Sequence, residues 1–592
     1  MNGINAIYRY STITNEDLSK LDRMGKELKT SNVEDSIMWH NEVCILSQTT
    51  SSTYEFNQQS PLSNSDKSLI LVCDGTIYNY QELSKDLAIK GYKCQTKYTY
   101  EVILYLYELY GKKCVDYLRG IFAFCIYDLK NKKMFVARDR MGEKTIYYAN
   151  IPNGFIISTE FRTILKEYIS YPQVNIRSLL EPIRYIAPLD MEQTWVKQIK
   201  RLQPGYCIEI DLDGFIISQY WNRKSVSLIS CNREEALSTT LDLMSESINL
   251  TMQTNEPIAV MLSGGIDSSA VATLAKLNGH EVHSITVGFG GNVEYDERNV
   301  AKRLAKEKGF DYNEIMLNPE DYTHAFEELT QYIDEPITDS AVIAQWVLYK
   351  KLNELGYKVV LSGMGGDELF YNYAWLNNQA EARKLKHQFE QICPINTKER
   401  KKQWYKLMRA HWKALIMPQA WHMTDESTYI PWYHQQYQAF LKDAVLKYGD
   451  SVYNLSNYSP HQIYPNCQIG KEIEQAYDDA IDRIMLGAYL YLGGKMSSSN
   501  SIEVRCPLID CKLVEYVMSL PLEMKGRNKS FMKDVLKGIL PDYILNAEKR
   551  GFTPSTNYPQ MIAEQHKYKH IYSSEPFYAV ALADKVLSRL LE

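Results

Sequence analysis

Two patterns of apolar residues divide the chain. In the first ~220 residues, short apolar runs alternate with polar turns. The segment "GIFAFCIYDLKNKKMFVARD" (120–139) has two such runs around a Lys-Asn-Lys turn, which predicts a β-hairpin. Strands are also predicted in 68–80, 154–159 and 205–221, and a helix over 101–111, where apolar residues recur at helical spacing before a glycine.

From residue 236 the pattern changes to alternating strands and helices. Helices are predicted over 236–249, 268–278, 296–309 and 341–355, and strands over 257–262, 283–289 and 358–363. This alternation predicts a doubly wound α/β domain with a parallel sheet. The polar segment 222–235 predicts a boundary between domains 1–222 and 223–592. Residues 375–490 read as mostly helical and rich in tryptophan, and we leave open whether these rings line a substrate pocket or pack helices.

Composition excludes several classes of protein. The 592 residues include 66 Lys and Arg against 72 Asp and Glu, so the chain as a whole lacks the basic footprint of a nucleic-acid-binding protein. There is no apolar run of ~18 residues to span a membrane and no signal-peptide pattern at the start. Eleven cysteines, an odd number without a CxxC pair, favour reduced thiols in the cytoplasm.

The strongest chemical signal is "AVMLSGGIDSSAVATLAK" (259–276), a strand followed by a Gly-Ser turn and a helix. Glycines let backbone N–H groups approach an anion, and the helix N-terminus favours negative charge. Serine hydroxyls add donors, and Asp267 is placed to hold Mg²⁺ against a phosphate. The pattern lacks the lysine of a Walker loop. The other interpretation is an ordinary glycine turn with a helix cap, but the flanking strand and helix favour a phosphate loop.

A second Gly-rich turn ends another predicted strand in "VVLSGMGGDELFYNY" (359–373). In a doubly wound sheet, two such turns at the carboxyl ends of strands are expected to face one nucleotide. Asp367 then shares a metal ion with Asp267.

With a third block, "KMSSSNSIEVRCPLID" (495–510), and the downstream segment 527–554, these motifs resemble the synthetase domain of glutamine-dependent asparagine synthetases. The first loop resembles that of the N-type ATP pyrophosphatases, which cleave ATP between the α and β phosphates. The resemblance implies that Lys529 faces the phosphates and stabilises developing negative charge. The expected nucleotide contacts, from the loop chemistry and the resemblance together, are Leu262, Ser263, Gly264, Gly265, Asp267, Ser268, Ser269, Val287, Ser362 and Gly363, and the expected magnesium ligands are Asp267 and Asp367.

The first 222 residues resemble the class II glutaminase domain, through segments 75–83, 100–128 and 137–148. The resemblance implies the αββα sandwich of amino-terminal nucleophile hydrolases. In that family a cysteine follows Met1 and attacks glutamine, but this chain has Asn2. The family's arginine, amide-donor and acidic positions correspond to Ser31, Asp74 and Thr99. We expect a domain that does not hydrolyse glutamine and that serves as a structural platform.

The second turn also differs from the corresponding turn of asparagine synthetases. Met364 lies where they have a glutamate that can hold ammonia or take its proton, and a thioether accepts no proton. β-Lactam synthetases and lasso-peptide macrocyclases vary at this turn too. Glu503 matches the glutamate that β-lactam synthetases use, which makes it a candidate base, with an ion pair to Arg505 or Lys495 as the alternative.

The leading hypothesis is therefore an ATP- and Mg²⁺-dependent amide ligase of specialised metabolism. It joins a small-molecule or peptide carboxylate to an amine that is not glutamine-derived ammonia. The alternatives are an asparagine synthetase that uses free ammonia, a non-catalytic scaffold, and an RNA-modifying enzyme, which the acidic charge disfavours. Whether the protein forms a homodimer is left open.

Overall fold

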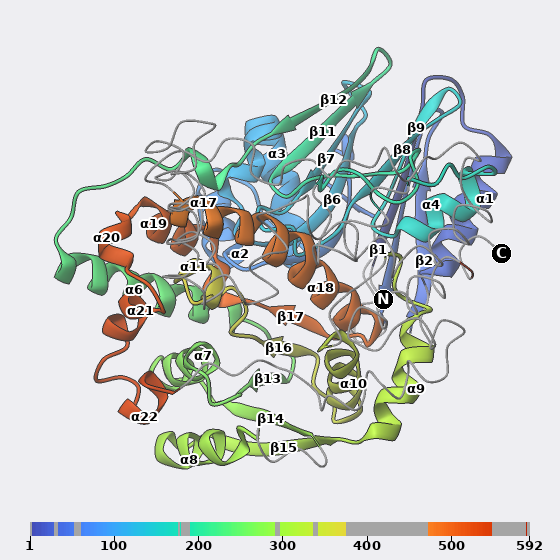
Figure 1. Ribbon diagram of the computed structural model, residues 1–592. Helices are drawn as coiled ribbons and strands as arrows, with labels where there is room; N and C mark the ends of the chain where they lie inside the picture. The colour runs from blue at the N-terminus through green and yellow to red at the C-terminus, as the bar shows by residue number, and fades with distance from the viewer. Residues whose placement is uncertain are drawn as a thin grey trace, which may run out of the picture.

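The structure is a computed structural model that describes residues 3–28, 33–51, 61–175, 178, 190–289, 296–335, 341–373, 472–547 and 588. Figure 1 shows the N-terminal strands in blue to green at the top and the C-terminal α/β part below them, with helix α18 (Leu490–Ser499) running between the two. Within these residues, no helix combines the length and the apolar character needed to cross a membrane.

Two six-stranded sheets pack face to face in the N-terminal part. The first has the order β10-β8-β9-β1-β3-β2, and its strands are Lys200–Arg201, Tyr147–Ile151, Gly154–Ser158, Gly3–Arg9, Cys44–Ser51 and Val33–His40. The second has the order β12-β11-β7-β6-β5-β4, and its strands are Gly214–Gln219, Tyr206–Asp211, Lys133–Arg138, Gly120–Asp128, Leu69–Ile77 and Leu62–Ser63. Because side chains alternate along a strand, β1 sends Ile4 and Ala6 into the core between the sheets, while Ile7 packs on the opposite face.

Helices cover both outer faces of this pair of sheets. Helices α1 (Asn15–Glu27) and α4 (Phe161–Tyr168) share a core with the first sheet. Helices α2 (Tyr80–Ile89) and α3 (Val102–Tyr110) share one with the second. The four layers are the αββα sandwich that the resemblance implied, and that prediction is confirmed.

The C-terminal part contains a five-stranded sheet in the order β15-β14-β13-β16-β17, and every neighbouring pair is parallel. Its strands are Asp311–Leu317, His283–Phe289, Ile258–Met261, Val359–Leu361 and Glu503–Arg505. Ala259 and Val360 pack on the side of α9 (Pro319–Leu329), α10 (Ala341–Glu354) and α18. Val260 and Leu361 pack on the side of α6 (Arg233–Thr251), α7 (Ile266–Leu277) and α8 (Arg298–Lys308). The predicted doubly wound sheet is therefore confirmed.

The strand order places a switch point between β13 and β16. From β13 the chain moves outward through β14 to β15, and it then returns to β16 and β17 on the other side of β13. Loops that follow the strands on either side of a switch point turn away from each other and leave a crevice at the carboxyl ends, where such sheets bind ligands. The two Gly-rich turns follow these two strands.

The remaining helices lie after the second Gly-rich turn. Helix α11 (Gly366–Leu369) is short, and a helix formed by α17 (Glu472–Asp479), a π-helical stretch (Ala480–Tyr489) and α18 leads back to β17. The helices after β17 are α19 (Cys511–Ser519), α20 (Leu522–Lys525), α21 (Ser530–Val535) and α22 (Asp542–Leu545). Residues 374–471, most of the predicted aromatic-rich segment, lie outside the described residues. The domain division after residue 222 remains a prediction.

Candidate active site

The turn after β13 is held by its own serines. The Ser263 N–H donates to Ser268 Oγ at 3.1 Å, the two hydroxyls lie 3.0 Å apart, and the Gly265 N–H donates to Ser263 Oγ at 3.3 Å. Gly264 has a φ of +78°, and a Cβ there would press on Val300 of α8. A residue with a side chain is therefore disfavoured at this point. Ser263 stays exposed, as a loop that meets a nucleotide requires.

The second turn lies directly against the first. A Cβ on Gly363 would come within 2.7 Å of the Ser268 nitrogen, and one on Gly366 would overlap the Asp267 carboxylate. Only glycine permits this approach at either position. The structure thus brings together the two motifs that sequence spacing placed at one crevice.

Lys529 joins the two turns. Its Nζ forms ion pairs with Asp267 and, at 2.7 Å, with Asp367 Oδ1. Its side chain is 2% exposed, whereas the two carboxylates are 21% and 24% exposed. Burial lowers the pKa of Lys529, but the two neighbouring carboxylates outweigh burial, so the net shift is upward and the group stays charged.

The backbone around Lys529 is in an unusual conformation. Tyr371, Asn528 and Lys529 have φ values of 58°, 54° and 56°, in the left-handed region that costs a non-glycine residue about 1–2 kcal/mol. The Asn528 N–H donates to Tyr371 O at 2.8 Å, and the Lys529 N–H to Phe370 O at 3.2 Å. Such strain gathers at functional sites. Sequence reasoning missed it, although an asparagine beside Lys529 is a weak signal for this region.

The other predicted nucleotide contacts differ in their access to the crevice. The Leu262 N–H donates to Ile285 O at 2.9 Å, and Val287 lies two residues further along β14, beyond the end of β13. The Ser362 N–H donates to Arg505 O at 3.0 Å, which fixes the start of the second turn. Ser269 is fully buried, and its Oγ has no hydrogen-bond partner among the described residues. Its hydroxyl therefore does not face the crevice as predicted.

Glu503 lies away from the carboxyl edge of the sheet. It pairs in register with Val359, the first residue of β16. Its carboxylate accepts hydrogen bonds from Arg505 Nε at 2.7 Å and from the Thr76 hydroxyl of the N-terminal sandwich at 2.8 Å. Burial raises the pKa of Glu503, but Arg505 and Lys144 outweigh it and hold the pKa below its usual value. Of the two ion pairs considered from sequence, the structure contains the one with Arg505, and a role as base remains a prediction.

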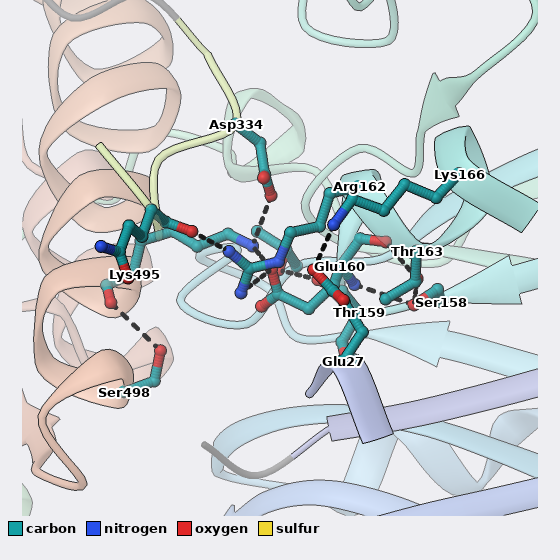
Figure 2. A network of polar contacts seen from close by, with 12 residues as sticks. Glu27, Ser158, Thr159, Glu160, Arg162, Thr163, Lys166, Asp334, Lys495 and Ser498 are labelled. Atoms are coloured by element: carbon teal, nitrogen blue, oxygen red, sulfur yellow. Dashed lines mark hydrogen bonds and ion pairs between the residues drawn. The ribbon is translucent and has the colours of Figure 1, made fainter. Parts of the chain in front are cut away.

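Lys495 belongs to a second buried network between the two parts of the chain (Figure 2). From α18 its Nζ contacts Glu160 and, at 3.3 Å, Asp334 Oδ2. Arg162 Nη2 lies 3.9 Å from the same Glu160 carboxylate. All four side chains are almost fully buried, so removing one partner would leave an uncompensated charge in the interior. No sequence motif pointed to this network.

A small cavity also lies between the two parts, lined among others by Tyr78, Arg140, Glu143 and Cys506. It leaves about 20 Å³ for the centres of water molecules, enough for water but not for a substrate. Tyr78 Oη and Arg140 Nε are buried there without a partner in the described part of the chain, and water would satisfy them. Burial raises the pKa of Glu143 well above its usual value.

The glutaminase-like pocket holds an ion pair at one of its altered positions. The Lys144 ammonium donates to Asp74 Oδ1 at 2.7 Å, and both side chains are largely buried. Thr99 Oγ1 accepts from the Ile77 N–H at 3.1 Å. Asn2 and Ser31, the other two altered positions, lie outside the described residues.

Comparison with known proteins identifies both parts of the chain. The model of the family described as Asparagine synthase matches residues 239–589, more than half of the chain. The chain belongs to the asparagine synthase family. The model of the Glutamine amidotransferase domain matches residues 1–221. As a member of the family, the protein is an ATP-dependent, AMP-forming carbon–nitrogen ligase.

Named relatives include glutamine-hydrolyzing asparagine synthetase 1 of Bacillus subtilis, which is 28% identical over 510 residues, or 84% of this chain and 77% of that protein. Asparagine synthetase 3 of the same organism is 25% identical and covers 98% of this chain and 91% of that protein. Amidase chyE of Penicillium rubens is 24% identical over 83% of this chain and 78% of that protein. At these identities the family is shared, but the substrates need not be.

Proposed function

We propose that this protein adenylates a carboxylate with Mg·ATP, releases pyrophosphate, and condenses the acyl-adenylate with an amine that does not come from glutamine. Its substrates are then a small-molecule or peptide carboxylate and an amine, in specialised metabolism. The observation that carries the first half is the convergence of Ser263–Ser269, Asp367 and Lys529 at one crevice.

The donors at this crevice suit a magnesium ion bound together with phosphates. Asp267 and Asp367 supply two carboxylates, and Mg²⁺ is usually held by one or two carboxylates plus substrate phosphates. No group of three or more histidine, cysteine or carboxylate side chains that could hold a metal by itself occurs among the residues the structure describes. The loop N–H groups and the N-terminus of α7 then bind phosphate oxygens, and Lys529 offers a cation to the charge that develops.

The second half rests on the state of the glutaminase-like pocket. The Asp74–Lys144 pair lies at the position that corresponds to the family's amide donor. In place of a neutral donor, this position therefore has the Asp74 carboxylate, which is paired with the Lys144 ammonium. The nucleophile position is Asn2, whose carboxamide cannot replace a thiolate. Met364, packed near Gly493 of α18, supplies no proton acceptor for ammonia.

The test measures pyrophosphate release with ATP and pools of carboxylic acids, each with and without amines. We expect release with a subset of acids and an amide product only when an amine is present, and no stimulation by glutamine. Stimulation by glutamine with formation of glutamate would overturn the second half of the proposal. No release with any acid pool, including extracts of the native host, would favour a scaffold.

A second candidate is an asparagine synthetase that uses free ammonia, favoured by the relatives named asparagine synthetase. Aspartate and ammonium should then yield asparagine, AMP and pyrophosphate. Failure at high ammonium concentration removes this candidate.

A further inference from the structure

Lys529 holds the two carboxylates at the place where the metal is expected. Its ammonium contacts Asp267 Oδ2 and Asp367 Oδ1, which come from the first turns of α7 and α11. Two carboxylates this close repel each other unless a cation lies between them. The cation that lies between them is the protein's own lysine.

A lysine ammonium and a magnesium ion cannot use these oxygens in the same way. An ammonium donates at 2.7–2.9 Å along N–H bonds, whereas Mg²⁺ requires oxygens at about 2.0–2.1 Å in octahedral geometry. A metal that takes Asp267 Oδ2 or Asp367 Oδ1 therefore displaces Lys529 from that oxygen, and a metal on the other carboxylate oxygens is repelled by the neighbouring ammonium.

The backbone restricts how Lys529 responds. Its N–H is bonded to Phe370 O, and its carbonyl accepts from the Lys533 N–H at 2.8 Å as α21 begins. Its Cα is thus tied to the end of α11 and to α21, and the four-carbon stem is the part that rotates. The crevice side is open, because both carboxylates keep more than a fifth of their surface exposed.

We propose that Lys529 is a resident counter-ion that exchanges with the metal: it holds Asp267 and Asp367 together in the empty enzyme and turns to the phosphates when Mg·ATP takes the carboxylates. This inference rests on the proposed function, in which these two carboxylates hold the metal. Metal alone then binds poorly, because the displaced ammonium has no new partner. When the nucleotide is bound, its phosphates pair with the displaced ammonium. The nucleotide therefore raises the affinity for the metal, and the metal raises the affinity for the nucleotide by the same factor.

The test uses Mn²⁺ as the probe, counted by electron paramagnetic resonance, with full-length protein and a non-cleavable α,β-methylene ATP. Wild type should bind Mn²⁺ weakly alone and at least about tenfold more tightly with the nucleotide. Lys529→Met keeps the stem and removes the charge, so it should bind Mn²⁺ about tenfold more tightly than wild type without nucleotide and lose most of the coupling. Lys525→Met is the matched control, since Lys525 is equally buried but bonds the Tyr371 hydroxyl, and it should behave as wild type.

A second variant keeps the test decisive if Lys529→Met does not fold. Lys529→Arg retains a cation with a fork that grips carboxylates more firmly, and it should weaken nucleotide-dependent Mn²⁺ binding. Equal Mn²⁺ affinity of Lys529→Met and wild type without nucleotide overturns the exchange, as does unchanged binding by Lys529→Arg. Asp367→Asn tests the proposed metal site separately from the exchange. If nucleotide-dependent Mn²⁺ binding survives in Asp367→Asn, the proposed metal site is wrong. If that binding is lost in Asp367→Asn, but Lys529→Met gains no Mn²⁺ affinity without nucleotide, only the exchange is rejected.

Discussion

Thr76 and Glu503 lie 427 positions apart in the chain and share a hydrogen bond of 2.8 Å between the sandwich and the last strand of the parallel sheet. The bond comes from β5, two residues beyond Asp74, and reaches β17, two residues before Arg505. The strand that carries Asp74, one of the altered glutaminase positions, thus contacts the strand that lies beside β16 and its Gly-rich turn.

This contact makes a prediction about stability. Thr76→Val removes the hydroxyl from a buried charged partner and should lower the free energy of unfolding by about 1.5–3 kcal/mol. Thr240→Val is the control, because its buried hydroxyl donates to Ala236 O within α6, and its effect should stay below about 1 kcal/mol. Urea unfolding at pH 7 measures both. Equal effects of the two variants would contradict a specific contact between the sandwich and the parallel sheet.

Glu503 adds a pH dependence with a defined sign. Its pKa in the folded protein lies below its usual value, so its charged form stabilises the fold above the unfolded pKa, and this contribution is lost as pH falls through the folded pKa. Wild type should therefore lose stability relative to Glu503→Gln as the pH is lowered through the acid range. A constant difference between the two proteins across that range would refute the assignment.

The contact between the two Gly-rich turns predicts a loss of activity. Gly366→Ala places a Cβ against the Asp267 carboxylate and should reduce pyrophosphate release at least about 100-fold, because misplacement of a catalytic group by 1 Å has effects of that size. At Gly493 the nearest atom to a new Cβ is Met364 Cε at 3.7 Å, so Gly493→Ala serves as the space-tolerant control. Similar activity in both alanine variants would show that the close approach is unimportant.

From the altered residues of the glutaminase-like pocket, we expect that one substitution does not restore glutamine hydrolysis. Asn2→Cys supplies the family's nucleophile but leaves the Asp74–Lys144 ion pair and a threonine at 99. Glutamine hydrolysis, followed as ammonia release, should stay at the rate without protein. Turnover by Asn2→Cys alone would mean that the pocket had lost only its nucleophile.

The buried ammonium of Lys525 leads us to expect that the folded protein becomes more stable at alkaline pH. Burial lowers its pKa from its usual 10.5 to about 8. Between these values the unfolded chain binds more protons than the folded one, so stability rises with pH through that window. Lys525→Met should lose this rise, which is at most about 3 kcal/mol. Urea midpoints of wild type and variant at pH 7.5, 9 and 10 measure it, and parallel pH profiles would contradict it.

The sequence predicted the parts of the site that depend on local pattern. Both turns are adjacent to strands whose apolar runs are unambiguous, and parallel topology then places Ser263 and Ser362 at one edge. Lys529 was expected from the resemblance, since no local pattern distinguishes a buried lysine from an exposed one.

What sequence could not supply are contacts between distant segments. Thr76 and Glu503, or Lys144 and Asp74, pair only because the sandwich docks on the sheet or because a loop folds over a strand. Ser269 was expected to donate its hydroxyl to a phosphate with the other serines of the loop, but its side chain is buried in the interior. Side-chain direction at a helix start depends on where the first turn begins, which patterns locate only within a few residues.

The chain leaves the sheet region at Tyr373 and returns at Tyr477 in close contact. The Tyr373 N–H donates to the Tyr477 hydroxyl at 3.0 Å, and that hydroxyl donates to Tyr373 O at 3.2 Å. These two bonds tie the chain just beyond α11 to α17, so the turn that carries Asp367 is held on one side by α7 and on the other by α17.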